Sequence, residues 1–123
     1  MIKKETNKGG IIFFRTGDLA EIDDFYTNKI GCTLWLDQDS CRIYQHGNLL
    51  FGFCESGKSE KQGIITFFYK ETKEVDAMYE KLKNIADKKP IHNKRYNIYH
   101  FYAKDPEGRN VEFQSFEHEI PAF

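Results

Sequence analysis

Residues 98–116, IYHFYAKDPEGRNVEFQSF, decide the fold of this chain. At their centre, Asp105–Gly108 combines an Asp-Pro pair with a glycine, which is strong turn chemistry, and segments rich in apolar residues lie on both sides. The stretch therefore predicts an antiparallel hairpin. Side chains alternate between the faces of a strand, so cross-strand partners share a face. Two such pairs are predicted on one face: Tyr102 with Glu112, and His100 with Gln114.

A strand and a helix precede this hairpin. Ile64–Tyr69 is apolar on both faces and predicts a strand, and Thr72 is a suitable N-cap for the helix that follows. The apolar stripe of that helix has helical spacing: Val75, Met78, Tyr79, Leu82, Ile85 and Ala86. The basic stretch Asp87–Arg95 predicts a loop with room for one short strand.

The first half of the chain has the same order of elements. Ile11–Phe14 predicts a strand, and Asp18 followed by Glu21 resembles a capping box at the start of a helix. Apolar residues then fall at helical spacing up to a stop at Gly31: Leu19, Ile22, Phe25, Tyr26 and Ile30. Three short strands are predicted after it: Thr33–Leu36, Cys41–Gln45 and Leu49–Cys54.

The two halves align as an internal repeat. Phe13-Phe14 matches Phe67-Phe68 at an offset of 54, the helix segments 22–26 and 75–79 match at 53, and Gly47 matches Gly108 at 61. The chain therefore predicts one domain, residues 1–123, made of two βαβββ modules at about 9–55 and 63–118. A half this small cannot bury its own sheet face, so the modules must pack on each other or on a second copy, and a homodimer is expected.

Composition excludes some classes of protein. The 18 basic and 19 acidic side chains give a net charge of -1, whereas nucleic-acid binding normally needs a basic excess. No apolar run reaches the ~18 residues that span a membrane. The three cysteines, an odd number without metal-site spacing, predict free thiols in a reducing cytoplasm. The 11 Phe, 7 Tyr and 1 Trp fit either an aromatic core or an aromatic-lined pocket.

Three segments together resemble the vicinal oxygen chelate superfamily, which contains glyoxalases, bleomycin-resistance proteins and dioxygenases. They are Arg15–Leu19, Asp24–Tyr26 with Ile30-Gly31, and Asp105–Phe113. The resemblance spans residues 9–118 and implies an α+β fold in which two βαβββ modules form a curved mixed sheet around a cavity. It does not imply one reaction, because this fold supports several chemistries as well as simple binding.

The resemblance also locates the metal positions of metal-using relatives, two per module and usually His or Glu. Glu112 matches the most regular of these ligands. The repeat offsets place apolar residues at the other three: Phe51, Ile11, and Ile65 or Ile64. Because one carboxylate with apolar neighbours cannot hold a divalent ion tightly, no cofactor is expected. The alternative is one divalent metal ion held by Glu112 and His100.

The predicted site combines polar and aromatic side chains. Glu112 and Tyr102 are the candidate catalytic residues, with a purely structural carboxylate as the alternative for Glu112. Arg15 is at a position where glyoxalase-like relatives meet an anionic group, although an ion pair with Glu112 is the alternative. His100 and Tyr102 match ligand-contacting positions of the fosfomycin-resistance branch. The remaining candidates are Phe13, Trp35, Phe51, Phe53, Phe67 and Gln114, for whose rings the core is the alternative.

These observations favour a cytoplasmic, metal-free protein that binds a small, partly aromatic or amphipathic molecule, sequestration of an antibiotic included. The alternative is a metal-dependent lyase, isomerase or dioxygenase that uses Glu112 and His100. A third hypothesis, an RNA-stacking sheet, lacks a basic-aromatic strand motif. No catalytic nucleophile motif is present, and whether the protein is an enzyme stays open at this point.

Overall fold

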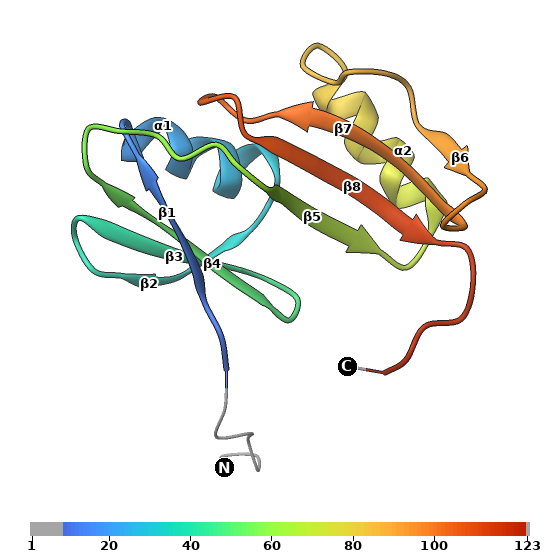
Figure 1. The fold of residues 1–123 in the computed structure, drawn as a ribbon, viewed down its shortest axis with the longest axis horizontal. Coiled ribbons are helices and arrows are strands. Elements are labelled where there is room, and N and C mark those ends of the chain that lie inside the picture. The colour runs from blue at the N-terminus through green and yellow to red at the C-terminus, as the bar shows by residue number, and fades with distance from the viewer. Residues whose placement is uncertain (1–8, 123) are drawn as a thin grey trace.

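Two four-stranded sheets form the protein, and helices cover one face of each sheet (Figure 1). The computed structural model describes residues 9–122. The first module is β1 (Ile12–Thr16), α1 (Leu19–Asp24), η1 (Phe25–Lys29, a π-helical turn), β2 (Thr33–Asp37), β3 (Cys41–His46) and β4 (Leu49–Glu55). The second is β5 (Ile64–Tyr69), α2 (Thr72–Leu82), β6 (Ile91–Asn93), β7 (Ile98–Lys104) and β8 (Asn110–Phe116). The predicted α+β class and the two βαβββ modules are confirmed.

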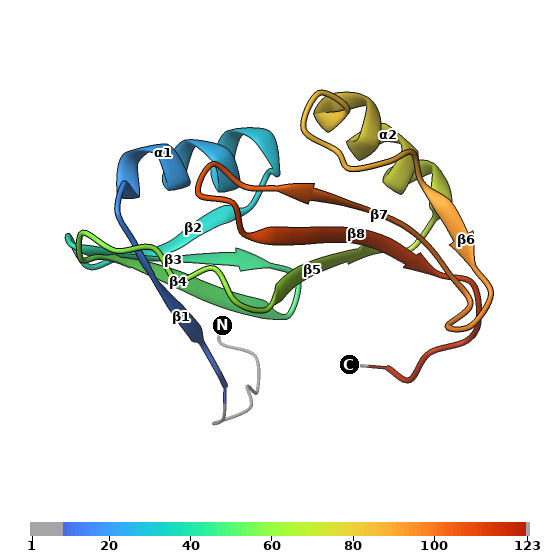
Figure 2. The same cartoon turned by 45° about the horizontal axis from the view of Figure 1, so that its top comes forward.

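Both sheets have the same topology. Their strand orders are β1-β4-β3-β2 and β5-β8-β7-β6. The first and last strand of each module pair in parallel, and the other neighbours are antiparallel. α1 and α2 lie on the same side of the molecule (Figure 2). Each sheet therefore has one face against its helix and one open face that the chain's own helices do not cover.

The helices begin close to the predicted positions. The Asp18 side chain accepts a hydrogen bond from the backbone N–H of Glu21 at 3.1 Å, as expected for an N-cap. The N-cap of α2 is Glu71 rather than Thr72, because Glu71 and Glu74 form a reciprocal capping box. No helix within residues 9–122 is long and apolar enough to cross a membrane.

Aromatic rings fill the space between the sheets and the helices. Phe14 stacks on Phe53 in the first module, and Phe67 stacks on Phe113 in the second. The two clusters meet where Phe51 contacts Phe67, with ring centroids 5.8 Å apart. The aromatic excess of the sequence therefore forms one core that runs through both modules.

This core corrects the repeat alignment of the first strands. Because Phe14 and Phe67 both face the helices, the structural offset is 53, the same as in the helix segments, and not 54. A shift of one residue moves a strand side chain to the opposite face. Phe13 is thus equivalent to Thr66, and the pairing Phe13↔Gly52 is equivalent to Thr66↔Glu112.

The cysteines differ from the prediction of three free thiols. Cys41 and Cys54 are direct cross-strand partners in β3 and β4, and they form a disulfide. Cys32 is free and buried, and burial raises the pKa of its thiol to about 12. Two cysteines 13 residues apart showed no pairing signal in the sequence, because only the register of the hairpin brings them together. The cytoplasmic location stays a prediction that the cysteines no longer support.

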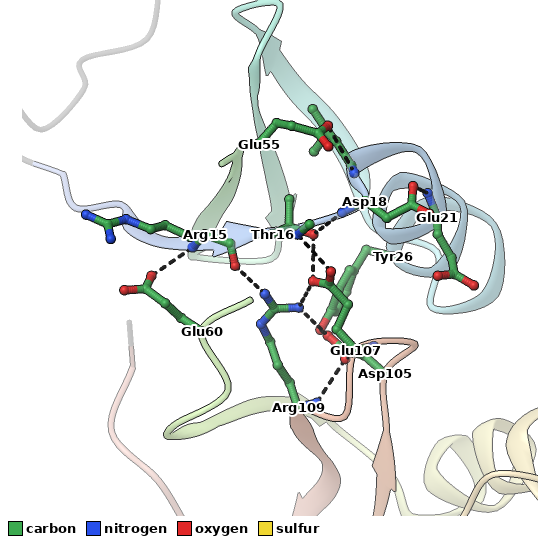
Figure 3. Close-up of polar contacts among 12 residues, drawn as sticks. Arg15, Thr16, Asp18, Glu21, Tyr26, Glu55, Glu60, Asp105, Glu107 and Arg109 are labelled. Carbon is green, nitrogen blue, oxygen red and sulfur yellow. Dashed lines mark hydrogen bonds and ion pairs between the residues drawn. The ribbon is translucent and has the colours of Figure 1, made fainter. Parts of the chain in front are cut away.

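A buried arginine joins the two modules (Figure 3). Arg109, directly before the last strand, is 2% exposed. Its guanidinium donates to Asp105 Oδ2 at 3.1 Å, to Glu107 Oε1 at 2.9 Å and to the backbone carbonyl of Arg15 at 2.6 Å. The hydroxyl of Tyr26 donates to Asp105 Oδ2 at 2.8 Å. The turn of the second module is therefore tied to β1 and to η1 of the first.

Glu107 completes this network on the side of β1. Its carboxylate accepts hydrogen bonds from the Thr16 hydroxyl at 2.6 Å and from the Gly17 N–H at 2.8 Å. Burial alone would raise the pKa of Glu107, but hydrogen bonds from Ser59, Thr16, Gly17 and Arg109 outweigh it and hold the pKa below its ordinary value.

We expect Glu107 to make the fold sensitive to acid. A carboxyl whose pKa is lower in the folded state stabilises the fold above its unfolded pKa, about 4.3, and this contribution is lost as the pH falls through the lower folded pKa. Glu107→Gln should therefore flatten the decline of the unfolding free energy between about pH 5 and pH 3. Urea denaturation over this range measures it. Glu119→Gln, in the exposed tail, is the control, and an equal effect of both variants would contradict the assignment.

Candidate functional site

The open face of the second sheet carries a concavity of about 490 Å³. It lies over β7 and β8, which supply alternate residues of each strand. Its lining combines six polar or ionisable side chains with three largely apolar ones: Asn93, His100, Tyr102, Glu112, Gln114 and His118, with Tyr96, Ile98 and Phe116. The volume lies within the range of about 300–1,000 Å³ that small-molecule sites occupy.

A buried imidazole–carboxylate pair forms the floor of this concavity. His100 and Glu112 are 6% and 7% exposed. His100 Nδ1 lies 2.7 Å from Glu112 Oε2, and the Thr66 hydroxyl donates to Glu112 Oε1 at 2.8 Å. The contact with Glu112 fixes the orientation of the imidazole and leaves its Nε2 for a ligand.

Two further polar groups stand beside this pair. Tyr102 faces Glu112 across the hairpin, and its ring contacts that of His100 with centroids 5.2 Å apart. Burial, followed by the charge of Glu112 and a hydrogen bond to it, raises the pKa of Tyr102, so its hydroxyl keeps its proton. Gln114 Oε1 is buried and has no hydrogen-bond partner within residues 9–122. A buried acceptor without a partner is costly, so a ligand donor at Gln114 would gain stability.

The residues present do not fit a metal centre. Glu112 pairs with Thr66, and the equivalent pair of the first module is Gly52 and Phe13. This register corrects Phe51 and Ile65, which face the core. Ile11 and the alternative Ile64 are exposed and offer no donor atom. Only Glu112 offers a carboxylate, and both of its oxygens already accept hydrogen bonds. Within residues 9–122, no group of three or more His, Cys, Asp or Glu side chains is placed to hold a metal ion. His100 and Glu112 bind each other instead of converging on a third atom.

The ring of Phe13 occupies the space above Gly52. A Cβ at residue 52 would lie 2.6 Å from Phe13 Cε1 and 3.0 Å from the Arg42 carbonyl oxygen. A glutamate in the second module thus corresponds to a glycine under an aromatic ring in the first. The first module offers a flat apolar surface at this position.

The structure brings together four of the predicted site residues and separates the others. His100, Tyr102, Glu112 and Gln114 line one concavity, with the predicted cross-strand pairing. Phe13 and Arg15 lie on β1, and Trp35 lies at a bulge in the edge strand β2, all in the first module. The Arg15 guanidinium is exposed and points away from the Arg109 network (Figure 3), with no partner among the described residues, which excludes the ion pair with Glu112 here.

Three predicted pocket rings belong to the core instead. Phe51, Phe53 and Phe67 have no exposed surface and face the helices. A side chain in that position cannot touch a ligand on the open face. For Phe51 the cause is the offset of 61 taken from Gly47 and Gly108. The offset between β4 and β8 is 60, so Gly52 and not Phe51 is equivalent to Glu112.

Several residues that line the site or hold its carboxylate were missed from the sequence. Thr66 alternates with the buried Ile65 and Phe67, so the period of two places it on the open face with Glu112. The same period applied to the predicted hairpin would have found Ile98 and Phe116. His118 and Tyr96 lie in the tail and in a loop, where no periodic signal exists.

The chain has the fold of solved structures that are named glyoxalase/bleomycin resistance protein/dioxygenase. A protein of that name from Alicyclobacillus acidocaldarius has a TM-score of 0.73 and 18% identity, over 91% of this chain and 93% of its own. Lactoylglutathione lyase from Agrobacterium tumefaciens has a TM-score of 0.73 and 17% identity, over 93% and 97%.

A further neighbour is an integron cassette protein from the mobile metagenome of the Halifax Harbour sewage outfall, with a TM-score of 0.74 and 16% identity over 90% of this chain and 100% of that one. No protein-family model and no curated protein matches the sequence. At these identities the neighbours establish the fold, and the predicted resemblance is confirmed at that level.

Proposed function

We propose that this protein binds a small, partly aromatic or amphipathic molecule in the concavity over β7 and β8, without a metal ion. The observation that carries the proposal is the His100–Glu112 pair, which is buried at the floor of a cavity. Its two side chains contact each other, with His100 Nδ1 2.7 Å from Glu112 Oε2. A metal centre would need both groups to turn their donor atoms toward a third atom. In the present geometry they offer hydrogen-bonding groups to a ligand.

The ligand would be held by enclosure and oriented by few polar contacts. The buried Gln114 Oε1 is an acceptor, the Tyr102 hydroxyl is a donor, and His100 Nε2 is a third polar group. Tyr96 and Phe116 supply apolar surface at the edge of the concavity. A ring or short chain that carries both a donor and an acceptor matches this pattern.

Antibiotic sequestration is one form of such binding. Several neighbours carry bleomycin resistance in their names. A cationic drug would favour an acidic protein, and this chain has a net charge of only -1. A neutral or weakly charged aromatic molecule therefore suits the protein better than bleomycin does.

A ligand-binding experiment tests this function. A thermal-shift screen of aromatic metabolites, antibiotics and divalent ions should identify a small molecule that raises the melting temperature. Glu112→Gln should weaken its binding by about tenfold or more, because the buried His100 and Thr66 then face a neutral amide. Titration calorimetry of that ligand measures the change.

Glu80→Gln, on the exposed face of α2, is the matched control and should leave the affinity unchanged. Stabilisation by several kcal/mol from one divalent ion, lost in Glu112→Gln, would instead establish the metal-dependent alternative. If the parent protein and the Glu112→Gln variant bound the identified ligand with equal affinity, this concavity would not be its binding site.

We also propose a homodimer that covers the open faces. Large apolar side chains are exposed along β1, β2 and β5, with Phe13 at 45%, Trp35 at 48% and Ile64 at 53%. All three strands are edge strands of their sheets, and a second copy can cover the apolar side chains that they expose. A second copy that brought its first module over this concavity would close the site and supply Phe13 and Arg15 to it.

Light scattering after size exclusion should give twice the chain mass of 14.5 kDa. Phe13→Asp should shift the particle toward the monomer, because it places a charge in the centre of the covered surface. Ile85→Asp is the matched control, since Ile85 is similarly exposed (41%) but follows α2 on the helix side. A particle of 14.5 kDa for the unmodified protein would contradict the dimer.

A further inference from the structure

A second cavity lies on the opposite side of the molecule, between the two helical segments. It has a volume of about 450 Å³ and is bounded by η1, by the end of α2 and by the turn between β7 and β8. The tip of the β7–β8 hairpin reaches toward α1 and η1 of the first module (Figures 1 and 2). Nothing in the proposed small-molecule site uses this groove, because that site is on the open face of the second sheet.

The floor of the groove is apolar. Phe25 and Leu82 are both 2% exposed and form its base, while Ile85 and Pro106 border it. Ile85 continues the apolar stripe of α2 beyond the end of the helix, yet it is 41% exposed. The groove therefore leaves apolar surface in water that a ligand can cover.

Three lysines from three different elements surround this floor: Lys29 of η1, Lys81 of α2 and Lys104 of β7. None has a carboxylate partner within residues 9–122. Lys81 donates to the backbone carbonyl of Asn28 and Lys104 to the Asn110 amide oxygen, which are neutral acceptors, and Lys29 has no partner among the described residues.

Asp105, the one carboxylate among the described residues that line the groove, is already neutralised. Asp105 is 4% exposed, pairs with Arg109 and accepts from the Tyr26 hydroxyl. The ammonium groups are thus in excess at this cavity in a chain whose net charge is -1. Lysine stems also add apolar surface while their charged ends stay in water, so the walls continue the floor.

We propose that this groove binds a single-chain amphiphile with a carboxylate or phosphate head and an apolar tail. The lysines meet the anionic head, and Phe25, Leu82 and Ile85 cover the tail. Charge complementarity selects the anion over a cation of the same length, and the apolar floor selects the amphiphile over a free inorganic anion.

The test titrates the full chain with octanoate, octyl phosphate, octanol, octylamine and inorganic phosphate, followed by amide chemical shifts. Octanoate and octyl phosphate should bind, with affinities that fall as salt rises, and should shift the amides around Lys29, Leu82 and Ile85. Octylamine and inorganic phosphate should not bind. Octanol should bind at least tenfold more weakly than octanoate.

Matched variants locate the binding. Lys29→Gln combined with Lys104→Gln should weaken octanoate at least tenfold, whereas Lys58→Gln combined with Lys73→Gln, which removes the same charge from exposed positions elsewhere, should not. Ile85→Asn should weaken octanoate and octanol alike, with little effect on folding because Ile85 is partly exposed.

Four outcomes would overturn the proposal: no binding at millimolar octanoate, equal affinity for octylamine, equal losses in both double-lysine variants, or shifts centred on His100 and Tyr102. The proposal would also be overturned if the protein sedimented with phosphatidylglycerol vesicles but did not bind free octyl phosphate. That result would indicate a membrane-surface site instead. Because Glu112→Gln leaves this groove intact, failure here is distinguishable from failure of the open-face site.

Discussion

Replacing Arg109 with methionine should lower the free energy of unfolding by about 3–5 kcal/mol, measured by urea denaturation at neutral pH. The guanidinium is 2% exposed and holds Asp105, Glu107 and a carbonyl of β1 together. Methionine has a similar length and keeps contact with the Phe53 ring, over which the guanidinium carbon lies at 4.8 Å. The loss therefore comes from leaving a buried carboxylate without its partner.

Arg95→Met is the matched control, because Arg95 is exposed and only lies over the Tyr96 ring. It should change stability by less than about 1 kcal/mol. If Arg109→Met fails to fold, Arg109→Lys gives the same information, since a lysine keeps the charge but cannot reach Asp105, Glu107 and the Arg15 carbonyl together. A loss below about 1 kcal/mol in Arg109→Met would mean that the network does not join the modules.

Phe67→Ala should lower the free energy of unfolding by about 3–5 kcal/mol. Phe67 is fully buried and its ring contacts rings of both modules, among them Phe51 at 5.8 Å and Phe113 at 5.6 Å. The substitution leaves a cavity at the point where the two aromatic clusters meet. Thermal and denaturant unfolding measure the loss.

Phe13→Ala tests the corrected repeat alignment, in which Phe13 is equivalent to Thr66 and not to Phe67. Phe13 is 45% exposed on the open face, so its removal should cost well under half of the Phe67 loss in the monomer. Ligand affinity and dimer mass, rather than stability, should respond to Phe13. Comparable stability losses in Phe13→Ala and Phe67→Ala would mean that Phe13 is a core residue.

Most of the fold was predictable because its signals are local. The period of two in residues 98–116 and the Asp-Pro-Glu-Gly turn place β7 and β8 within one residue of their observed bounds. Asp18 and Gly31 mark the two ends of the first helical segment through cap chemistry. The disulfide between Cys41 and Cys54 was not predictable, since it depends on cross-strand register.

The site was half predictable for a related reason. The hairpin places His100, Tyr102, Glu112 and Gln114 on one face, because a pairing between adjacent strands follows from the turn. The contribution of the first module depended on the alignment of two strands that are distant in sequence. An error of one residue there exchanged Gly52 for Phe51 and the open face for the core.

The Arg109 network also has a consequence for the order of events during synthesis. The partners that Arg109 and Asp105 tie down in the first module, the Arg15 carbonyl and the Tyr26 hydroxyl, precede them by 94 and 79 residues. These contacts to β1 and η1, unlike the pairing of β1 with β4, therefore form only after residue 109 has left the ribosome. Until then the nascent first module lacks the ring of Phe67 beside Phe51 and the acceptor of the Tyr26 hydroxyl, so its core is completed by the second half of the chain.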